Sequence, residues 1–185
     1  MKAVVDDLLQ SQLFGGDYIA MHYRFDDDDF LSRCAKDFSQ MCQFIRDMKN
    51  DLKTAAKNFV NFLETKRSQG IAIKAVYLAA PPQETEIRSK IRNALKLKYP
   101  NEEVKFVDAN DVEPFYRRIA NIPEGLNGDI MSSIEQEICM RSRIFLAARP
   151  SSWSSNVSIQ RVGDPAIRKY VADGEFLLDV LAGNV

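Results

Sequence analysis

The stretch IAIKAVYLAAPPQETEIRSKIRNALKLKYPNEEVKFV, Ile71–Val107, decides the fold class. Its first part, Ile71–Ala79, is largely apolar and ends before Pro81-Pro82, which predicts a buried strand. Glu84–Lys98 carries apolar residues at helical spacing, and Glu103–Val107 has the pattern of a short strand. A strand, a helix and a strand in this order predict two parallel strands joined by a crossover helix.

The alternation of helices and strands continues along the rest of the chain. Two further strands are expected at Tyr18–Tyr23 and Arg143–Ala148. Further helical segments are expected at residues 1–14, near 30–67, and at Ile130–Ser142, Asn156–Arg161 and Ala166–Leu181. This order predicts one domain over residues 1–185, an α/β, Rossmann-like parallel sheet with helices on both faces.

The composition limits the classes of partner. The chain has 185 residues, which suits one domain or half of a two-domain protein. A net charge of −1 creates no field that would attract nucleic acid or a membrane surface, so neither is an expected partner. No run of ~20 apolar residues is present, so no transmembrane segment is expected. Asp6 and Asp7 interrupt the N-terminus where a secretory signal would be apolar, so a helix is expected there.

The three cysteines, Cys34, Cys42 and Cys139, do not have metal-ligand spacing. An odd number of cysteines leaves two states open: one disulfide with one thiol, or three thiols. The cysteines therefore do not identify the compartment by themselves.

In parallel α/β sheets, ligands bind outside the carboxyl ends of the strands. The predicted strand ends are His22-Tyr23-Arg24, Ala80-Pro81-Pro82, Asp108-Ala109-Asn110 and Arg149-Pro150-Ser151-Ser152. Two of these ends carry arginine and one leads into a serine-rich turn. Together they predict one edge of the sheet that is rich in groups suited to phosphate.

Arg24 and the turn after the last strand are the strongest candidates on this edge. A guanidinium can hold a diphosphate through two parallel charged hydrogen bonds. His22 is expected to point to the same sheet face as Arg24, because strand side chains alternate. Trp153 offers a flat face to a base or sugar. Its neighbours at a helix start can bind an anion through their hydroxyls and backbone N–H groups. These neighbours are Ser151, Ser152, Ser154 and Ser155.

Each of these features also has an ordinary structural explanation. A single arginine at a strand end is more often a surface salt-bridge partner, a single histidine is more often structural, and serine-rich turns usually cap helices. The functional hypothesis depends on their convergence on one predicted edge.

The four consecutive aspartates Asp26–Asp29 have three interpretations. An Asp-x-Asp pair can hold a divalent cation against a nucleotide diphosphate. Aspartates also favour helix starts, where they offset the helix dipole, and a charge run is often simply solvated. A helical pattern follows directly, which favours capping and solvation over a metal site.

Two segments resemble one protein family. YIAMHYRF, Tyr18–Phe25, followed by an acidic stretch and Cys34, resembles the His-x-Arg motif of GDP-fucose protein O-fucosyltransferases. SSIEQEICMRSRIFLAARPSSWSSNVSIQR, Ser132–Arg161, resembles the second signature of that family. There, an Asp/Glu-Gln-x-Ile/Val-Cys helix leads through an apolar strand to a Ser-Ser/Thr-Phe-Ser turn and a later arginine. Both motifs occur in the family's order and on the expected elements.

The resemblance implies a GT-B architecture, in which two Rossmann-like halves enclose a cleft. This chain resembles the C-terminal, donor-binding half. The implied activity is transfer of fucose from GDP-fucose to a serine or threonine hydroxyl of an acceptor protein, with no cofactor besides the donor substrate. The family has no metal-dependent Asp-x-Asp site, so no metal is expected and Asp26–Asp29 are expected to start a helix or face solvent.

The resemblance also implies roles for single residues. The residues expected to bind GDP-fucose are His22, Arg24, Glu135, Ser151, Ser152 and Trp153. Arg24 is the expected catalytic residue, because it would hold the donor diphosphate and assist its departure. Glu135, where the family often has Asp, would recognise the nucleotide by accepting from guanine N–H groups. Trp153 stands where the family usually has Phe, which keeps the aromatic face but adds bulk.

The family's N-terminal half, with its Gly-rich loop and acceptor contacts, is not in this sequence. The chain is therefore expected to be a fragment, a subunit or an inactive relative of the enzyme. Two alternatives stay open: a non-catalytic nucleotide-binding module, and an interaction domain that uses the long Asp37–Lys66 helix as its contact surface. The resemblance implies the lumen of the endoplasmic reticulum or Golgi, although the chain shows no address for it.

Overall fold

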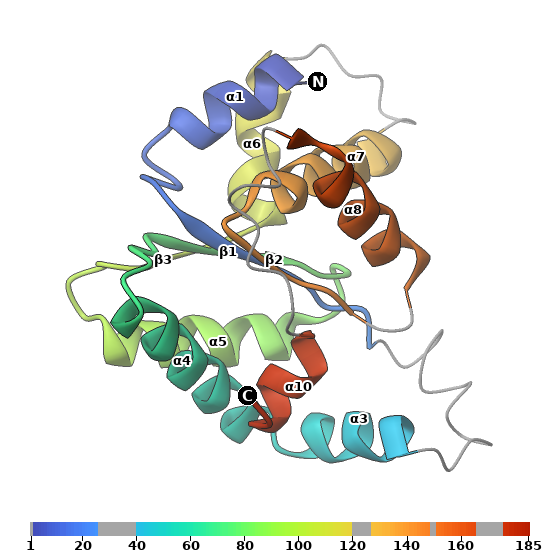
Figure 1. The fold of residues 1–185 in the computed structure, drawn as a ribbon. Helices are drawn as coiled ribbons and strands as arrows, with labels where there is room; N and C mark the ends of the chain where they lie inside the picture. Colours follow the sequence, from blue (N-terminus) through green and yellow to red (C-terminus); the bar gives the residue numbers. More distant parts are fainter. Residues whose placement is uncertain (1, 26–39, 120–126, 149–150, 166–175) are drawn as a thin grey trace.

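The computed structural model describes residues 2–25, 40–119, 127–148, 151–165 and 176–185. Its centre is a sheet of parallel strands in the order β3-β2-β1-β4 (Figure 1). The strands are β1 (Tyr18–His22), β2 (Ala75–Ala79), β3 (Lys105–Asp108) and β4 (Ile144–Leu146). The prediction of a Rossmann-like parallel sheet is confirmed at this level, because this order is that of one half of a doubly wound fold.

Helices cover both faces of the sheet, as predicted (Figure 1). One layer contains α3 (Gln40–Asn50), α4 (Leu52–Ser68), α5 (Thr85–Lys98) and α10 (Leu177–Ala182). The other contains α1 (Lys2–Gln10), α6 (Ala109–Ile119), α7 (Asn127–Arg141) and α8 (Ser152–Gly163). Among the described residues, no helix combines the length and the apolar content needed to cross a membrane.

Two hydrophobic cores lie on opposite faces of the sheet. Ile19 and Met21 of β1 pack with the α3–α4–α5–α10 layer, whereas Ala20 between them packs with the α1–α6–α7–α8 layer. β1, β2 and β4 are buried along their whole length, because each strand of a parallel sheet contributes to both cores. This explains why these strands are almost entirely apolar, with His22 at the end of β1 as the exception.

β1 is the central partner of the sheet. Ala20 lies opposite Tyr77 of β2 on one side and opposite Phe145 of β4 on the other. His22 ends β1 opposite Ala79. β1 and β4, the first and last strands of the described sheet, are therefore neighbours, and the residues that follow them emerge at the same edge.

The segment expected to be helical near 30–67 is helical over its described part, but it is not the single long helix expected over Asp37–Lys66. Residues 30–39 lie outside the described residues, and the remainder forms two helices, α3 and α4, that meet at Asp51. The backbone of Asp51 leaves the helical region at φ −135°, and its carboxylate accepts a hydrogen bond from the N–H of Thr54 at 3.0 Å. This is an N-cap, which starts a new helix although the apolar spacing continues across it.

Helix α6 was not predicted from the sequence. It contains Pro114, which normally disfavours a helix interior because it lacks an N–H group. Its start is stabilised by Asp108, which accepts from the N–H of Asn110 at 2.9 Å, and by Asp111, which accepts from the N–H of Asp108 at 3.0 Å. This reciprocal capping offsets the proline.

The cysteines divide into two kinds. Cys42 is disulfide-bonded. Cys139 is a free, buried thiol, and burial raises its pKa well above the usual value. Cys34 lies outside the described residues. Of the two states left open by the sequence, the one with a disulfide is therefore the one present.

Candidate functional site

The described sheet reverses its strand order between β1 and β4. In chain order, β1 is followed by α3 and α4, which lie on one face of the sheet, and β4 is followed by α8, which lies on the other (Figure 1). In doubly wound sheets, this divergence at the carboxyl ends of two neighbouring strands is the usual place for a ligand. The candidate site consists of the residues at these two ends.

His22, at the end of β1, contacts the start of α8 directly. Its imidazole stacks on the indole of Trp153, with ring centroids 4.1 Å apart and an interplanar angle of 30°. Its Nδ1 is hydrogen-bonded to Oγ of Ser154 at 2.7 Å. The segments that carry the two predicted motifs therefore meet at this point, although they are 132 positions apart in the sequence.

His22 is held in its neutral form. Burial, and to a lesser degree the positive charge of Arg24, lowers the pKa of His22 to about 3. The side chain is 7% exposed. A neutral imidazole can position a ligand through a hydrogen bond, but it does not exchange a proton with water near neutral pH.

Arg24 is exposed at the same edge. The backbone N–H of the intervening Tyr23 still pairs with the carbonyl of Ala79 at 2.8 Å, so β1 keeps its direction up to Arg24. The charge of Arg24 acts on His22, which places the two side chains in one electrostatic environment.

The serine-rich turn is mainly a helix cap. Oγ of Ser151 accepts from the N–H of Ser154 at 3.3 Å, which makes Ser151 the N-cap of α8. Oγ of Ser154 is buried and accepts from the N–H of Ala148 at 3.1 Å. Ser155 donates to the carbonyl of Ser151 at 3.0 Å. These hydroxyls are committed to the backbone, so the structural explanation of the turn accounts for three of its four serines.

Two backbone donors at the start of α8 are not committed. Within the described part of the chain, the N–H groups of Ser152 and Trp153 have no hydrogen-bond acceptor. Ser152 is exposed. Free N–H groups at a helix start carry the positive end of the helix dipole and can accept an anion.

Trp153 is fixed on two sides. One face of the indole is covered by His22, and Nε1 donates to Oγ of Ser132 on α7 at 3.1 Å. The face toward His22 is therefore not open to a base or sugar. The side chain instead connects β1, α7 and α8.

Glu135 lies on α7 one helical turn beyond Ser132, so both side chains are on the same side of that helix. Oε1 of Glu135 accepts from the hydroxyl of Tyr77 at 3.0 Å. Burial raises the pKa of Glu135 to about 7, whereas the hydrogen bond from Tyr77 and the positive charge of Arg88 act in the opposite direction. This carboxyl is poised to gain or lose a proton near neutral pH.

Arg161, the later arginine of the second motif, is structural. It is 0% exposed, and its Nη1 donates to the carbonyls of Cys139, Met140 and Ser142 at 2.7–3.0 Å. These carbonyls lie at the end of α7 and in the turn before β4. Arg161 therefore holds α8 against that turn.

A second cluster at the sheet edge was not found from the sequence. Arg88 of α5 is 8% exposed and donates to the carbonyls of Ala80 and Pro82, just beyond β2. Its Nε lies 4.0 Å from Oδ2 of Asp108, which is 1% exposed and also pairs with Arg92 at 3.2 Å. One signal was available: Arg88 lies three positions before Ile91 and seven before Leu95, on the stripe of α5 that faces the core.

Some predicted features lie outside the described residues, namely Asp26–Asp29, Arg149 and Pro150. In the ranges that are described, no group of three or more His, Cys, Asp or Glu side chains is placed to hold a metal ion. Asp108, at the end of β3, and Asp111 are engaged in capping α6.

The fold and the strand ends define an α/β protein of the doubly wound type with a candidate ligand site at its switch point. Comparison with protein-family models, with curated proteins and with solved structures gives no match. These comparisons therefore assign no family and no function to the site.

Proposed function

We propose that the chain is the donor-binding half of a GDP-fucose-dependent protein O-fucosyltransferase with a GT-B architecture. The observation that carries this proposal is the contact between His22 and the Trp153–Ser154 pair. The His-x-Arg motif and the serine-rich turn are the two features on which the family resemblance depends. Their meeting at the switch point supports a common role in binding one ligand.

The diphosphate of the donor would lie between Arg24 and the start of α8. Arg24 supplies a guanidinium that stays charged at every working pH. The N–H groups of Ser152 and Trp153 supply two further donors. Transfer breaks the bond between fucose C1 and the β-phosphate oxygen, forms a bond from C1 to the acceptor hydroxyl oxygen, and releases the hydroxyl proton. Arg24 would stabilise the charge that develops on the departing GDP.

Glu135 would recognise the base. An ionised carboxylate can accept from two guanine N–H groups, whereas a protonated one offers fewer acceptors. Because the pKa of Glu135 is about 7, guanine binding would strengthen as pH rises through neutrality. Uracil does not offer the same pair of donors, so Glu135 would favour GDP over UDP.

The disulfide at Cys42 is in keeping with the oxidising lumen in which this family works. The acceptor protein and the cleft would require the family's N-terminal half. The chain's own contribution is therefore donor binding and stabilisation of the leaving diphosphate.

One observation favours an alternative, a nucleotide-binding module without catalysis. His22 has a pKa of about 3, and Glu135 is hydrogen-bonded to Tyr77. His22 is too weak a base to take the proton of an acceptor hydroxyl, and the Glu135 carboxylate would be engaged by Tyr77 and by the proposed guanine contact. On this alternative the site binds GDP but never transfers a sugar.

The nucleotide is tested by calorimetric titration of GDP, UDP and ADP into the protein, with GDP-fucose as the fourth ligand. GDP is expected to bind more tightly than UDP and ADP. Equal affinities, or no binding of any of the four, would contradict the proposal. Binding of GDP-fucose without consumption of the sugar, in the presence of an acceptor and an N-terminal half, would favour the module.

The phosphate assignment is tested with variants at Arg24. Arg24→Ala is expected to weaken GDP binding roughly tenfold or more, because charge-assisted hydrogen bonds contribute about 1.5–3 kcal/mol each. Arg24→Lys is expected to retain part of the affinity. The matched control is Arg117→Ala, which removes another exposed arginine from α6. A folded Arg24→Ala protein that binds GDP like the wild type would exclude the assignment.

A further inference from the structure

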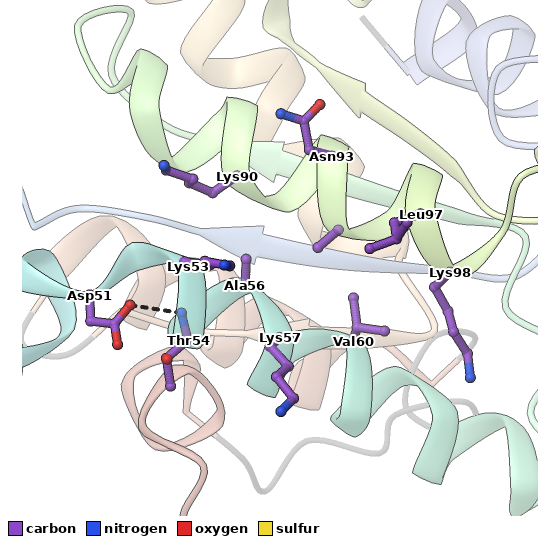
Figure 2. Close-up of a pocket in the computed structure, with 11 residues that line it drawn as sticks. Asp51, Lys53, Thr54, Ala56, Lys57, Val60, Lys90, Asn93, Leu97 and Lys98 are labelled. Atoms are coloured by element: carbon purple, nitrogen blue, oxygen red, sulfur yellow. Dashed lines mark hydrogen bonds between the residues drawn. The ribbon is translucent and has the colours of Figure 1, made fainter.

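A groove of about 800 Å³ runs between α4 and α5, on the helical layer below the sheet and away from the strand ends. Figure 2 shows the two helices side by side, with Ala56 and Val60 of α4 directed toward α5. The apolar part of the lining consists of Ala56, Val60, Ala94 and Leu97. Leu97 is 87% exposed, the highest value among the large hydrophobic side chains of the described residues.

The rim of the groove is strongly basic. Lys53 and Lys57 line it from α4, and Lys90 and Lys98 line it from α5. The single acidic residue in the lining is Asp51, whose carboxylate is occupied in capping α4. A chain with a net charge of −1 thus concentrates four lysines around one apolar groove.

Neighbouring acidic residues reduce this charge only in part. Lys90 lies 3.7 Å from Glu86, and Lys98 lies 2.9 Å from Glu64. Both lysines are more than two-fifths exposed, and ion pairs of this kind contribute little and break easily. In the described part of the chain, Lys57 has no ion pair.

The spacing of the lysines matches a helical ligand. Lys90 and Lys98 are eight positions apart on α5, which corresponds to about 12 Å, or two helical turns, along the groove. Lys53 and Lys57 are one turn apart on the opposite wall. A helix that lies lengthwise in the groove would meet positive charge on both sides and apolar side chains beneath it.

We infer that the α4–α5 groove is a docking site for an acidic amphipathic helix of a partner protein. Leucine or phenylalanine at every third or fourth position of that helix would contact the exposed Leu97 and the partly buried Ala94, above the buried Ala56 and Val60. Glutamate or aspartate on its flanks would face the lysines. This inference is separate from the ligand site at the switch point, because the groove shares no residue with it.

The test uses a fluorescently labelled probe peptide of about 15 residues, long enough to form an isolated helix in part. It carries leucine at every third or fourth position and glutamate on both flanks. Two comparison peptides replace all glutamates with lysine or all leucines with glutamine. The expected result, measured by fluorescence anisotropy, is that the acidic leucine peptide binds and both comparison peptides bind much more weakly.

Two variants locate the binding. Lys57→Glu reverses an exposed rim charge and is expected to weaken binding about three- to tenfold. Leu97→Gln removes exposed apolar surface and is expected to weaken it roughly tenfold. The matched control, Lys96→Glu, changes the charge of the neighbouring exposed residue on α5, which does not line the groove. It is expected to leave the affinity within about twofold.

Three results would overturn the inference. The first is an equal loss of peptide affinity in Lys57→Glu and Lys96→Glu, which would show that only the net charge of the protein matters. The second is binding of the glutamine-substituted peptide, or of a heparin oligosaccharide, as tightly as the acidic leucine peptide, because the site would then be a general polyanion surface. The third is absence of binding to the folded wild type. Circular dichroism of each variant verifies that the fold is intact.

Discussion

The carboxyl ends of β1 and β4 differ sharply from those of β2 and β3, although both pairs form the same edge of one sheet. Beyond β2 and β3, the buried Arg88 donates to two loop carbonyls, and Asp108 pairs with Arg88 and Arg92. Beyond β1 and β4, Arg24 is exposed, and backbone N–H groups at the start of α8 have no acceptor among the described residues.

This difference between the two halves of the edge shows that being an arginine at the edge of the sheet does not decide whether the side chain has a structural role or is available to a ligand. Arg24 lies just beyond the end of β1, whereas Arg88 reaches the same edge from α5 and donates to the carbonyls of Ala80 and Pro82 beyond β2. Arg24, at the switch point, is instead exposed. Burial and local partners therefore decide which strand ends can receive a ligand.

The largest expected effect on stability concerns the region beyond β2 and β3. Arg88→Ala removes the donors to Ala80 and Pro82 and one partner of the buried Asp108 carboxylate, so we expect a loss of about 2–4 kcal/mol of unfolding free energy. Urea denaturation measures it. The matched control is Arg92→Ala, which removes the more exposed partner of the same carboxylate and is expected to cost less than about 1 kcal/mol. Equal losses would contradict the distinction.

The next prediction concerns Glu135, whose pKa is influenced by the charges of Arg88 and Asp108. Its pKa is raised in the folded protein from 4.5 to about 7, so the folded state holds the proton more tightly than the unfolded chain. Stability is therefore expected to fall as pH rises from about 4.5 to 7. Glu135→Gln lacks this titration and is expected to exceed the wild type by roughly 1–3 kcal/mol above about pH 8, with a much smaller difference below about pH 4.5.

Thermal and urea unfolding of both proteins across this pH range provide the measurement for Glu135. Parallel pH profiles of the two proteins would show that Glu135 has an ordinary pKa. The matched control is Glu137→Gln, which changes a carboxylate on the same helix that is paired with Arg141.

A smaller effect on stability is expected in the region beyond β1 and β4. Ser151→Ala removes the N-cap of α8 and is expected to cost about 1 kcal/mol of unfolding free energy. Ser155→Ala, a control in the same turn, removes a bond from an exposed hydroxyl to the carbonyl of Ser151 and is expected to change stability by less than about 0.5 kcal/mol. A change at Ser151 no larger than at Ser155 would mean that the cap contributes little.

The smallest effect on stability is expected for Arg24→Ala. The side chain is exposed, so the unfolding free energy is expected to change by no more than about 0.5 kcal/mol. Combined with the loss of GDP affinity proposed above, this separates a binding role from a structural one. A loss as large as that of Arg88→Ala, measured in the same urea series, would place Arg24 among the structural arginines.

The fold class was predictable because the strands of a parallel sheet are apolar on both faces. Ile71–Ala79 and Arg143–Ala148 are such runs, and β2 and β4 lie within them. The break at Asp51 was not predictable from periodicity, since Met48, Leu52 and Ala55 continue one apolar stripe across it. Only the side chain of Asp51, by capping the N–H of Thr54, divides that stripe between two helices.

The candidate site was predictable in its position and less so in its contacts. Because ligands of parallel α/β sheets bind at the carboxyl ends of strands, this rule predicts His22 and Arg24 as site residues. That His22 would cover one face of Trp153 depends on β1 and β4 being neighbours, which no local pattern encodes. The burial of Arg161 and Arg88 likewise could not be predicted from the sequence, because tertiary packing decides how many carbonyls surround a guanidinium.

The pairing of His22 with Ser154 has a consequence for the order of folding. These residues are separated by 132 positions, and closing a loop of that length costs about 4 kcal/mol of chain entropy. Contacts of such high contact order form late, after the local β2–α5–β3 unit has provided a surface on which β1 and β4 can align. Ligand-binding capacity is therefore expected to arise in the last stage of folding. A ligand that contacts the ends of both β1 and β4 would then stabilise the folded chain against separation of these two strands.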